Sequence, residues 1–158
     1  MVNTAHPAVD RVRVALRGHG LDPKIRWFDE AATTAPAAAA ALGIEVGAIA
    51  NSLVFLLDDE PLLVLTSGAH RVDTEWLGER LGGTIGRASK DAVKAATGQV
   101  IGGVAPVGHP SPLRTLVDVA LAEFPVVWAA AGHAHTVFPT TFDELVRITA
   151  GESTAVAP

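Results

Sequence analysis

Two apolar runs joined by a short acidic turn constrain the fold of this chain more than any other feature of the sequence. Residues 52–57 and 61–66 are rich in leucine and valine, and Asp58, Asp59 and Glu60 lie between them. Short runs of this composition predict β-strands, and a polar turn between two of them predicts a hairpin. Because neither run alternates strictly between apolar and polar residues, we expect the hairpin to be buried on both faces or nearly so.

Helix signals and further strand signals surround this hairpin. Pro, Ser, Thr or Asp at the start of a segment and Gly near its end are typical of helices. The predicted helices are residues 7–18, 33–42, 73–81, 89–96 and 141–149, and the further strands are residues 25–28, the beginning of 113–121, 126–131 and 133–138. Helices and strands alternate irregularly, and several strands could pair as hairpins. The pattern therefore favours an α+β fold with a mixed, largely antiparallel sheet.

The length and composition predict one domain with a sizeable core. The chain has 158 residues, so we assign residues 1–150 to a single domain and expect residues 151–158 to be a flexible tail. Hydrophobic residues make up 49% of the chain, which excludes intrinsic disorder. The absence of cysteine excludes disulfides, cysteine-ligated zinc and thiol catalysis. No apolar run is long enough to span a membrane, and residues 1–20 lack the apolar stretch of a secretory signal.

The charge balance narrows the possible nucleic-acid partners. The formal net charge is −5, which argues against non-specific binding to nucleic acid because such binding depends on neutralising phosphates. It still allows a few basic residues to recognise one end of a nucleic acid. The chain has only three lysines, Lys24, Lys90 and Lys94. Lys90 and Lys94 either form a solvated helix face or, in the case of Lys94, touch a nucleic acid.

A loop rich in glycine and proline is the first candidate for chemistry. Residues 99–112 read QVIGGVAPVGHPSP, with Gly102, Gly103, Pro106 and Gly108 close together. The loop matches neither the GxGxxG nor the GxxxxGK[ST] nucleotide-binding pattern. A row of exposed backbone N–H groups here would bind an anion or an ester carbonyl oxygen. The alternative is a tight structural turn in which glycine supplies the backbone freedom.

A pair of histidines is the second candidate. His133 and His135 are two residues apart, so on a strand their side chains would share one face. There they could bind a metal ion together with His109 or Asp118, contact a substrate, or simply form a polar strand end.

Two carboxylates complete the set of candidates. Asp118 interrupts an apolar run, so it either faces solvent or lies in a pocket with polar partners. Asp73 either caps the helix that follows it or belongs to a turn in which Arg71 contacts a phosphate.

Four sequence blocks together resemble a known family. They are IANSLVF at residues 49–55, SGAHRVD at residues 67–73, TGQVIGGVAPVG at residues 97–108, and Asp118 with the later pair Ala131 and Gly132. Over residues 34–149 the chain resembles the YbaK/prolyl-tRNA synthetase-associated editing domains, which are aminoacyl-tRNA deacylases. The most specific element is TG-x-x-x-GG-x-x-P-x-G, which contains the GxxxP loop of the family at residues 102–106.

The resemblance implies a fold and an activity. The fold is a curved mixed β-sheet or partial barrel with surrounding helices. The activity is hydrolysis of the ester between a wrong amino acid and the 3′-terminal adenosine of a tRNA, often tRNA(Pro), with no cofactor and no metal. A chain of this length would act as a free-standing cytoplasmic enzyme, alone or in association with a synthetase, and its partner would be the tRNA acceptor end.

The resemblance also implies the site residues. An aminoacyl ester is already activated, so backbone N–H groups of residues 102–106 would stabilise the oxyanion while a water or a substrate hydroxyl attacks. The aminoacyl group would lie near residues 102–108. The adenosine would lie near Asn51, Ser67 and His70. The implied catalytic residues are Gly102, Gly103, Val104, Ala105, Pro106 and Asn51, and the implied substrate-binding residues are Ser67, His70, Gly108, His109, Asp118, Gly132 and His135.

Asn51 is the clear departure from the family pattern. The family block has the form I-V-K-S-L-V-F, with a lysine that supports catalysis or holds the terminal nucleotide, and asparagine stands at that position here. Asparagine can hydrogen-bond a phosphate or sugar oxygen but carries no charge. Either another basic residue replaces the lysine, or the substrate differs, or the chain binds a tRNA end, a nucleotide or a small molecule without hydrolysing it. A metal-dependent hydrolase that uses His133 and His135 is a further alternative.

Overall fold

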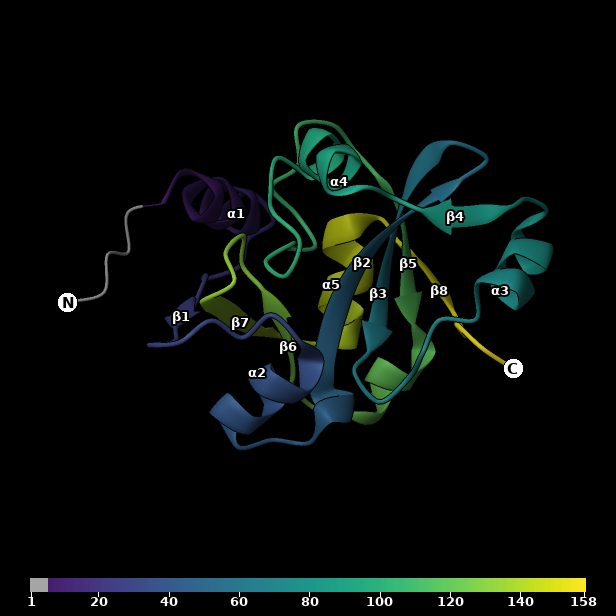
Figure 1. Ribbon diagram of the computed structural model, residues 1–158. Helices are drawn as coiled ribbons and strands as arrows, with labels where there is room; N and C mark the ends of the chain where they lie inside the picture. Colours follow the sequence, from purple (N-terminus) through teal and green to yellow (C-terminus); the bar gives the residue numbers. More distant parts are fainter. Residues whose placement is uncertain (1–5) are drawn as a thin grey trace.

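The computed structural model describes residues 6–158, which form one eight-stranded sheet surrounded by helices (Figure 1). The strands are β1 (Arg26–Trp27), β2 (Ile49–Leu57), β3 (Glu60–Ser67), β4 (Ile85–Arg87), β5 (Arg114–Asp118), β6 (Val127–Ala130), β7 (Thr136–Thr140) and β8 (Glu152–Thr154). The α-helices are α1 (Pro7–Gly18), α2 (Ala35–Leu42), α3 (Thr74–Leu81), α4 (Lys90–Thr97) and α5 (Phe142–Thr149), and short 3-10 helices span Val46–Ala48 and Val119–Glu123.

The sheet is open and mixed, which confirms the predicted α+β class. Its main strand order is β1-β7-β6-β2-β3-β5-β8. Among the described strands the pairs β1–β7, β2–β3, β2–β4 and β6–β7 are antiparallel. The pairs β2–β6, β3–β5 and β5–β8 are parallel. Helices α3 and α4 lie in the connection from β3 to β5, and α5 lies in the connection from β5 to β8, so neither connection is a tight hairpin.

The predicted hairpin is the centre of this sheet. β2 and β3 pair from Ala50 opposite Ser67 to Leu57 opposite Glu60. Asp58 and Asp59 make the turn with φ values of 48° and 69°, the left-handed conformation that suits a two-residue hairpin. Only β3 is buried along most of its length, whereas most of β2 is half-buried. The expectation of burial on both faces is therefore wrong for β2, because the sheet is interrupted beside it.

That interruption lies on the side of β2 away from β3. On this side Ile49 and Ala50 pair with β6, and Phe55 to Leu57 pair with β4. Residues 51–54 have no neighbour on this side among the described strands. Figure 1 shows β6 and β4 meeting β2 near its two ends. The chain thus leaves a gap in the sheet at the block that contains Asn51.

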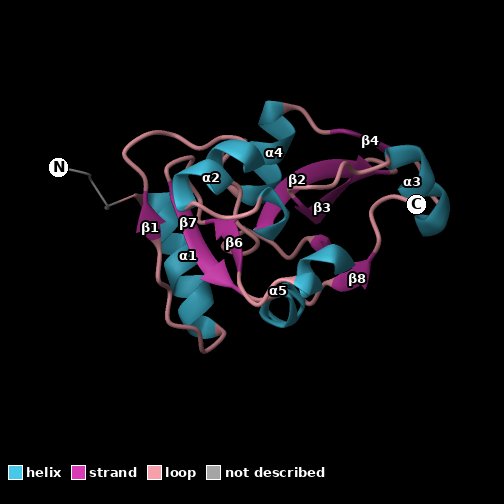
Figure 2. Cartoon of the chain, turned by 90° about the horizontal axis from the view of Figure 1, so that it is seen from below, coloured by secondary structure: helices cyan, strands magenta, loops and turns pink. Residues whose placement is uncertain are grey.

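Alternating residues of β3 join two parts of the core. Leu63 and Leu65 pack in a cluster that includes residues of α1 and α5. Leu62 and Val64 pack in a second cluster with Leu77 of α3. Successive side chains of a strand point to opposite faces, so one strand can serve both clusters. Figure 2 shows α2 and α4 on one side of β2 and α5 on the other.

The end of the chain corrects one expectation. Residues 151–158 do not form a flexible tail, because β8 pairs in parallel with β5 and Val156 is only 1% exposed. The backbone N–H of Asp73 donates to the carbonyl oxygen of Val156 at 2.9 Å. A short polar segment gives no local signal for such a strand, because the edge of β5 supplies its hydrogen bonds.

The predicted strand at residues 133–138 also begins later than expected. β7 starts at Thr136, because the Thr136 hydroxyl donates to the His133 carbonyl oxygen at 2.7 Å and accepts from the His133 N–H at 3.2 Å. His133 and His135 therefore lie in a turn and not on one face of a strand. The predicted strand in residues 113–121 ends at Asp118, whose side chain caps the following 3-10 helix.

No helix within residues 6–158 has the length and apolar character needed to cross a membrane. The expectation that residues 1–20 form no secretory signal includes residues 1–5, which lie outside the described range.

Candidate functional site

A cavity of about 900 Å³ lies beside the gap in the sheet. Residues 49–55 of β2 form one wall, and the other walls come from the start of α2, the segment after β3, β4, the glycine-rich loop and β7. Four of the residues implied by the family resemblance line this cavity: Asn51, His70, Gly102 and Val104. The fold therefore brings three of the four sequence blocks to one place.

The charged residues of the cavity wall are basic. Arg71 and Arg87 line the cavity together with His70, and no Asp or Glu of the described residues does so. The whole chain has a net charge of −5, so this concentration of one sign is local. Walls that carry charge of one sign attract ligands of the other sign. The cavity is suited to an anionic group, and Arg71 and Arg87 place positive charge on the wall that also contains Asn51.

His70 is held by a buried carboxylate beneath the cavity wall. Its Nδ1 lies 3.0 Å from Oδ2 of Asp118. The Asp118 side chain is 1% exposed, and the His70 side chain is 47% exposed. Asp118 also accepts hydrogen bonds from the N–H of Ser67 at 3.0 Å, the hydroxyl of Thr66 at 3.4 Å and the N–H of Ala120 at 3.0 Å. Asp118 thus lies in a pocket with partners, one of the two alternatives left open by the sequence.

Ser67 stabilises the position of Asp118. Its hydroxyl donates to the carbonyl oxygen of Gly47 at 2.8 Å, and its N–H donates to Asp118. The side chain is buried. Ser67 therefore fixes the end of β3 against the 3-10 helix at Val46–Ala48, while its neighbours Thr66 and Gly68 line the cavity.

The glycine-rich loop is held by Gln99, a residue that the sequence did not single out. The Gln99 side chain is buried and accepts from the N–H of Ala105 at 2.7 Å. Its amide group donates to the carbonyl oxygen of Val107 at 3.2 Å. One side chain thus links both ends of the bend. Glutamine in a loop carries no pattern that marks such a role, so only the tertiary structure identifies it.

Within residues 102–106, the free N–H groups are those of Gly102 and Val104. The N–H of Gly103 donates to the carbonyl oxygen of Val100 at 3.0 Å, Ala105 donates to Gln99, and Pro106 has no N–H. The N–H groups of Gly102 and Val104 have no hydrogen-bond partner within residues 6–158, and both residues line the cavity. Within residues 102–106 they are the donors that can hold an oxyanion.

Two glycines let the loop lie against the turn that precedes β7. The N–H of Gly132 donates to the carbonyl oxygen of Gly103 at 2.9 Å. A Cβ atom on Gly103 would lie 2.6 Å from the carbonyl carbon of His133, and Gly132 has φ +104°. Any side chain on Gly103 would push the loop away from the turn. Gly103 and Gly132 therefore position the loop and do not line the cavity.

His109 and Gly108 close the far end of the loop. Nε2 of His109 donates to the carbonyl oxygen of Ala105 at 2.8 Å. Burial lowers the pKa of His109, and the hydrogen bond to Ala105 offsets part of that effect. Gly108 packs against Val12 of α1 with φ +86°. Both residues fix the loop to the rest of the molecule.

The turn that contains His133 and His135 packs against the glycine-rich loop at Gly103. His133 and His135 have ring centroids 5.2 Å apart, and His133 Nδ1 accepts from the N–H of His135 at 3.1 Å. His135 Nδ1 lies 3.0 Å from the carbonyl oxygen of Phe28. Burial lowers the pKa of His133, and the nearby His6 and His135 lower it further. No group of three or more His, Cys, Asp or Glu within residues 6–158 is arranged to hold a metal ion.

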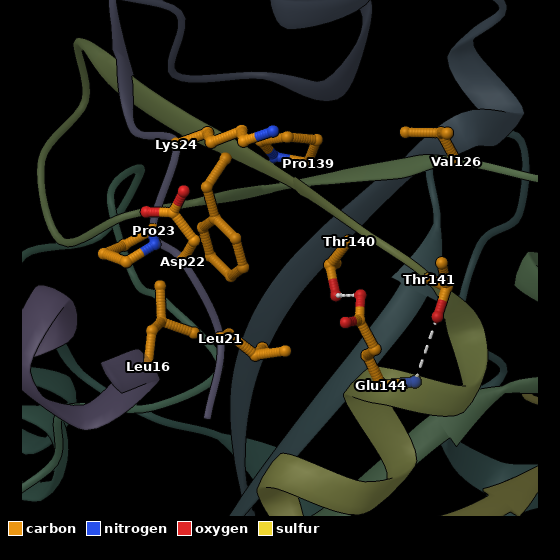
Figure 3. A pocket seen from close by; sticks show the side chains of 11 residues that line it. Leu16, Leu21, Asp22, Pro23, Lys24, Val126, Pro139, Thr140, Thr141 and Glu144 are labelled. Atoms are coloured by element: carbon orange, nitrogen blue, oxygen red, sulfur yellow. Dashed lines mark hydrogen bonds between the residues drawn. The ribbon is translucent and has the colours of Figure 1, made fainter. Parts of the chain in front are cut away.

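A smaller cavity of about 330 Å³ lies elsewhere on the molecule (Figure 3). Phe138 of β7 lines it, whereas Val137 lines the large cavity, and neighbouring residues of a strand face opposite sides. Lys24 lines this smaller cavity. Glu144 there already accepts from the hydroxyl of Thr140, as Figure 3 shows. Lys24 therefore does not take the place of the lysine that the family pattern has at position 51.

An open mixed sheet with a basic cavity and a glycine-rich wall defines an α+β domain with a candidate ligand-binding site. The chain belongs to the aminoacyl-tRNA editing domain family, whose model matches residues 29–148. This match confirms the family resemblance drawn from the sequence blocks.

The chain is also similar to a bacterial protein and to two solved structures. The uncharacterized protein YwhH of Bacillus subtilis (strain 168) is 29% identical over 119 residues, which cover 75% of this chain and 76% of that protein. A crystal structure of a proposed trans-editing enzyme for prolyl-tRNA synthetase is 36% identical with a TM-score of 0.90, covering 97% and 98% of the two chains. A structure from work on epitope grafting onto scaffold proteins is 35% identical with a TM-score of 0.89, covering 96% and 97%.

Proposed function

We propose that this protein hydrolyses the ester between a wrong amino acid and the 3′-terminal adenosine of a tRNA, of the tRNA(Pro) type. The observation that carries the proposal is the cavity that Gly102 and Val104, whose N–H groups have no partner within residues 6–158, line together with Arg71 and Arg87. Membership of the editing family and the likeness to a proposed trans-editing enzyme support it. The reaction needs an acceptor for oxyanion charge and a cationic contact for the tRNA end, and this wall offers both.

The chemistry follows from the nature of the ester. Attack of a water oxygen on the ester carbonyl places negative charge on the carbonyl oxygen. Backbone N–H groups that are already oriented stabilise this charge at no cost of reorganisation. The loop is fixed by Gln99, His109 and Gly132, so Gly102 and Val104 present their N–H groups in one arrangement. The proposed reaction uses no cofactor.

The partner in this proposal is the acceptor end of the tRNA. Arg71 and Arg87 would contact the terminal phosphates, while the acidic remainder of the chain would avoid long stretches of the nucleic-acid backbone. Editing by a separate site is useful because small amino acids differ by only about 1–3 kcal/mol per methylene in binding. A cytoplasmic location and an association with a synthetase are further parts of the proposal.

A deacylation assay tests this function. The protein is incubated with tRNA(Pro) charged separately with alanine, cysteine or proline, and the remaining aminoacyl-tRNA is followed over time. We expect at least one mischarged tRNA to lose its amino acid faster than in buffer, with the proline ester spared. If every mischarged tRNA survives as long as it does without protein, the hydrolase function is wrong.

Binding without hydrolysis is the second candidate, and Asn51 favours it. The residue lines the cavity without the charge of the family lysine. The same tRNAs carrying a non-hydrolysable amide in place of the ester would measure binding alone. Tight binding of the amide together with stability of the ester would identify the protein as a binder.

A further inference from the structure

We propose that His70, oriented by Asp118, is the general base of this cavity. The proposal rests on the proposed hydrolase function and adds a catalytic residue to it. The juxtaposition that carries it is a half-exposed imidazole on the cavity wall whose Nδ1 lies 3.0 Å from a buried carboxylate oxygen. A base held by a third group is the arrangement that positions a histidine for proton transfer.

The hydrogen bonds of Asp118 determine which nitrogen of His70 carries the proton. The N–H groups of Ser67 and Ala120 can only donate, so both carboxylate oxygens of Asp118 act as acceptors. Oδ2 accepts from Ser67 and also contacts His70 Nδ1. Nδ1 must therefore donate, and the neutral imidazole then has its lone pair on Nε2. Nε2 is the ring nitrogen left free to accept a proton from a substrate or water.

The scaffold around the pair fixes the ring. Asp118 ends β5, and Thr66 and Ser67 end the neighbouring strand β3. His70 follows β3 by three residues, so the two parallel strands place the carboxylate directly under the ring. Asp118 is 1% exposed, and within residues 6–158 His70 is the histidine that hydrogen-bonds to it. The carboxylate thus restricts the imidazole to one orientation at the cavity wall.

In the proposed step His70 takes up one proton and later returns it. His70 Nε2 accepts a proton from a water molecule while the water oxygen forms a bond to the ester carbonyl carbon. The resulting oxyanion is held by the N–H groups of Gly102 and Val104. The bond from that carbon to the ribose 3′ oxygen then breaks, and His70 returns its proton to the leaving oxygen. The products are a free amino acid and an uncharged tRNA, and the histidine is restored.

Kinetic measurements on the full chain test the role of His70. With alanyl-tRNA(Pro) or cysteinyl-tRNA(Pro) as substrate, whichever the wild type cleaves, His70→Ala is expected to lower kcat by about 100-fold or more while KM changes little. Added imidazole is expected to restore part of the rate, which a purely structural role would not allow. His19→Ala is the matched control, because His19 is exposed at the end of α1, and it should keep the wild-type rate.

Nuclear magnetic resonance gives a readout that needs no substrate. Nitrogen-15 spectra of the His70 ring are expected to show Nδ1 protonated and Nε2 free in the neutral form. The opposite tautomer would overturn the proposal, and so would a His70→Ala variant that keeps the rate of an active wild type; the proposed function would stand in both cases. If the wild type cleaves none of the mischarged tRNAs, the proposed function fails and His70 loses its role with it.

Discussion

Asn51 lies on the cavity wall at the position where the family resemblance implies a lysine. It belongs to the part of β2 that has no strand neighbour on the cavity side. Arg71 and Arg87 line the same cavity, so positive charge is present although it comes from other elements. We propose that these arginines replace the lysine, which is one of the three explanations drawn from the sequence.

A lysine introduced at position 51 tests whether Arg71 and Arg87 fully replace the charge of the family lysine. We expect Asn51→Lys to raise kcat/KM for the cleaved aminoacyl-tRNA by about fivefold, because a charged hydrogen bond exceeds a neutral one by about 1 kcal/mol. Asn51→Gln keeps an uncharged amide and serves as the control, with no such gain. A lysine variant that is no faster than the wild type would mean that the arginines already supply the contact in full.

Arg87 offers a direct measure of phosphate contact. Removing one phosphate contact to a single strand lowers the slope of log affinity against log salt by about 0.7. We therefore expect Arg87→Ala to raise KM several-fold at low salt and to reduce its salt dependence, with a smaller effect on kcat. Arg80→Ala is the control, because Arg80 stacks 4.7 Å from the Trp76 ring and does not line the cavity. Equal salt slopes for Arg87→Ala and wild type would contradict the assignment.

The lowered pKa of His109 makes the free energy of unfolding depend on pH. Burial lowers its pKa below the ordinary 6.5, so on acidification the unfolded chain takes up this proton first. The unfolding free energy is then at its full value above about pH 6.5 and falls as the pH drops toward the lowered pKa. His133 acts in the same direction, because burial, His6 and His135 lower its pKa.

Urea unfolding between about pH 5 and pH 8 checks this dependence. His109→Gln keeps a donor for the carbonyl oxygen of Ala105 but does not titrate, so we expect it to flatten the profile while His133 leaves a residual slope. A wild-type profile that is already flat over this range would contradict the assigned direction of both pKa shifts.

At the scale of elements, the helices were the most predictable part of the molecule. Their N-caps act locally. In four helices the N-cap side chain accepts a hydrogen bond from the backbone N–H three residues later, as expected; these caps are Thr34, Asp73, Ser89 and Thr141. The loop at residues 99–112 was also visible in the sequence as a candidate. Which of its N–H groups stay free was not, because that depends on Gln99 and on contacts with the distant turn at His133.

Gln99 is expected to carry much of the loop's stability. Gln99→Ala would leave the N–H of Ala105 and the carbonyl oxygen of Val107 buried without their partner. We expect the free energy of unfolding to fall by about 2–4 kcal/mol, at about 1–3 kcal/mol per unsatisfied buried group. Urea denaturation measures the loss. Val100→Ala is the control in the same loop, since Val100 is 49% exposed and should change stability by less than about 0.5 kcal/mol; equal losses in the two variants would contradict the role of Gln99.

At the scale of the whole molecule, the features that the sequence did not predict depend on contacts between residues that are distant along the chain. The hairpin of β2 and β3 follows from two adjacent runs and a turn, and it was predicted. β8 depends on the edge of β5, and the turn at His133 depends on the Thr136 side chain, so neither has a local signature strong enough to be recognised. The same applies to the pairing of His70 with Asp118, which are far apart in the sequence and join only when β3 and β5 align.

The end of the chain is expected to stabilise the whole domain. Removing residues 152–158 would expose the edge of β5 and the core residues that pack against Val156, and it would free the N–H of Asp73. Burying a valine side chain contributes about 1.5–3 kcal/mol, so we expect the truncated protein to lose at least that much unfolding free energy. Val156→Ala isolates the packing term, with an expected loss of about 1–2 kcal/mol. Thermal and urea unfolding identical to those of the full chain would show that the segment is dispensable.

The gap beside β2 has a consequence for how this domain can diverge. Residues 51–54 pair with β3 on one side and have no strand neighbour on the other side among the described strands. A substitution there changes the cavity wall without disturbing the pairing with a second strand. The buried stretch of β3 has no such freedom, because both its faces and both its neighbours are committed to the core. Substitutions at positions such as 51 can therefore change which ligand the cavity accepts while the free energy of folding stays nearly the same. Ligand specificity and stability can thus evolve separately in this domain.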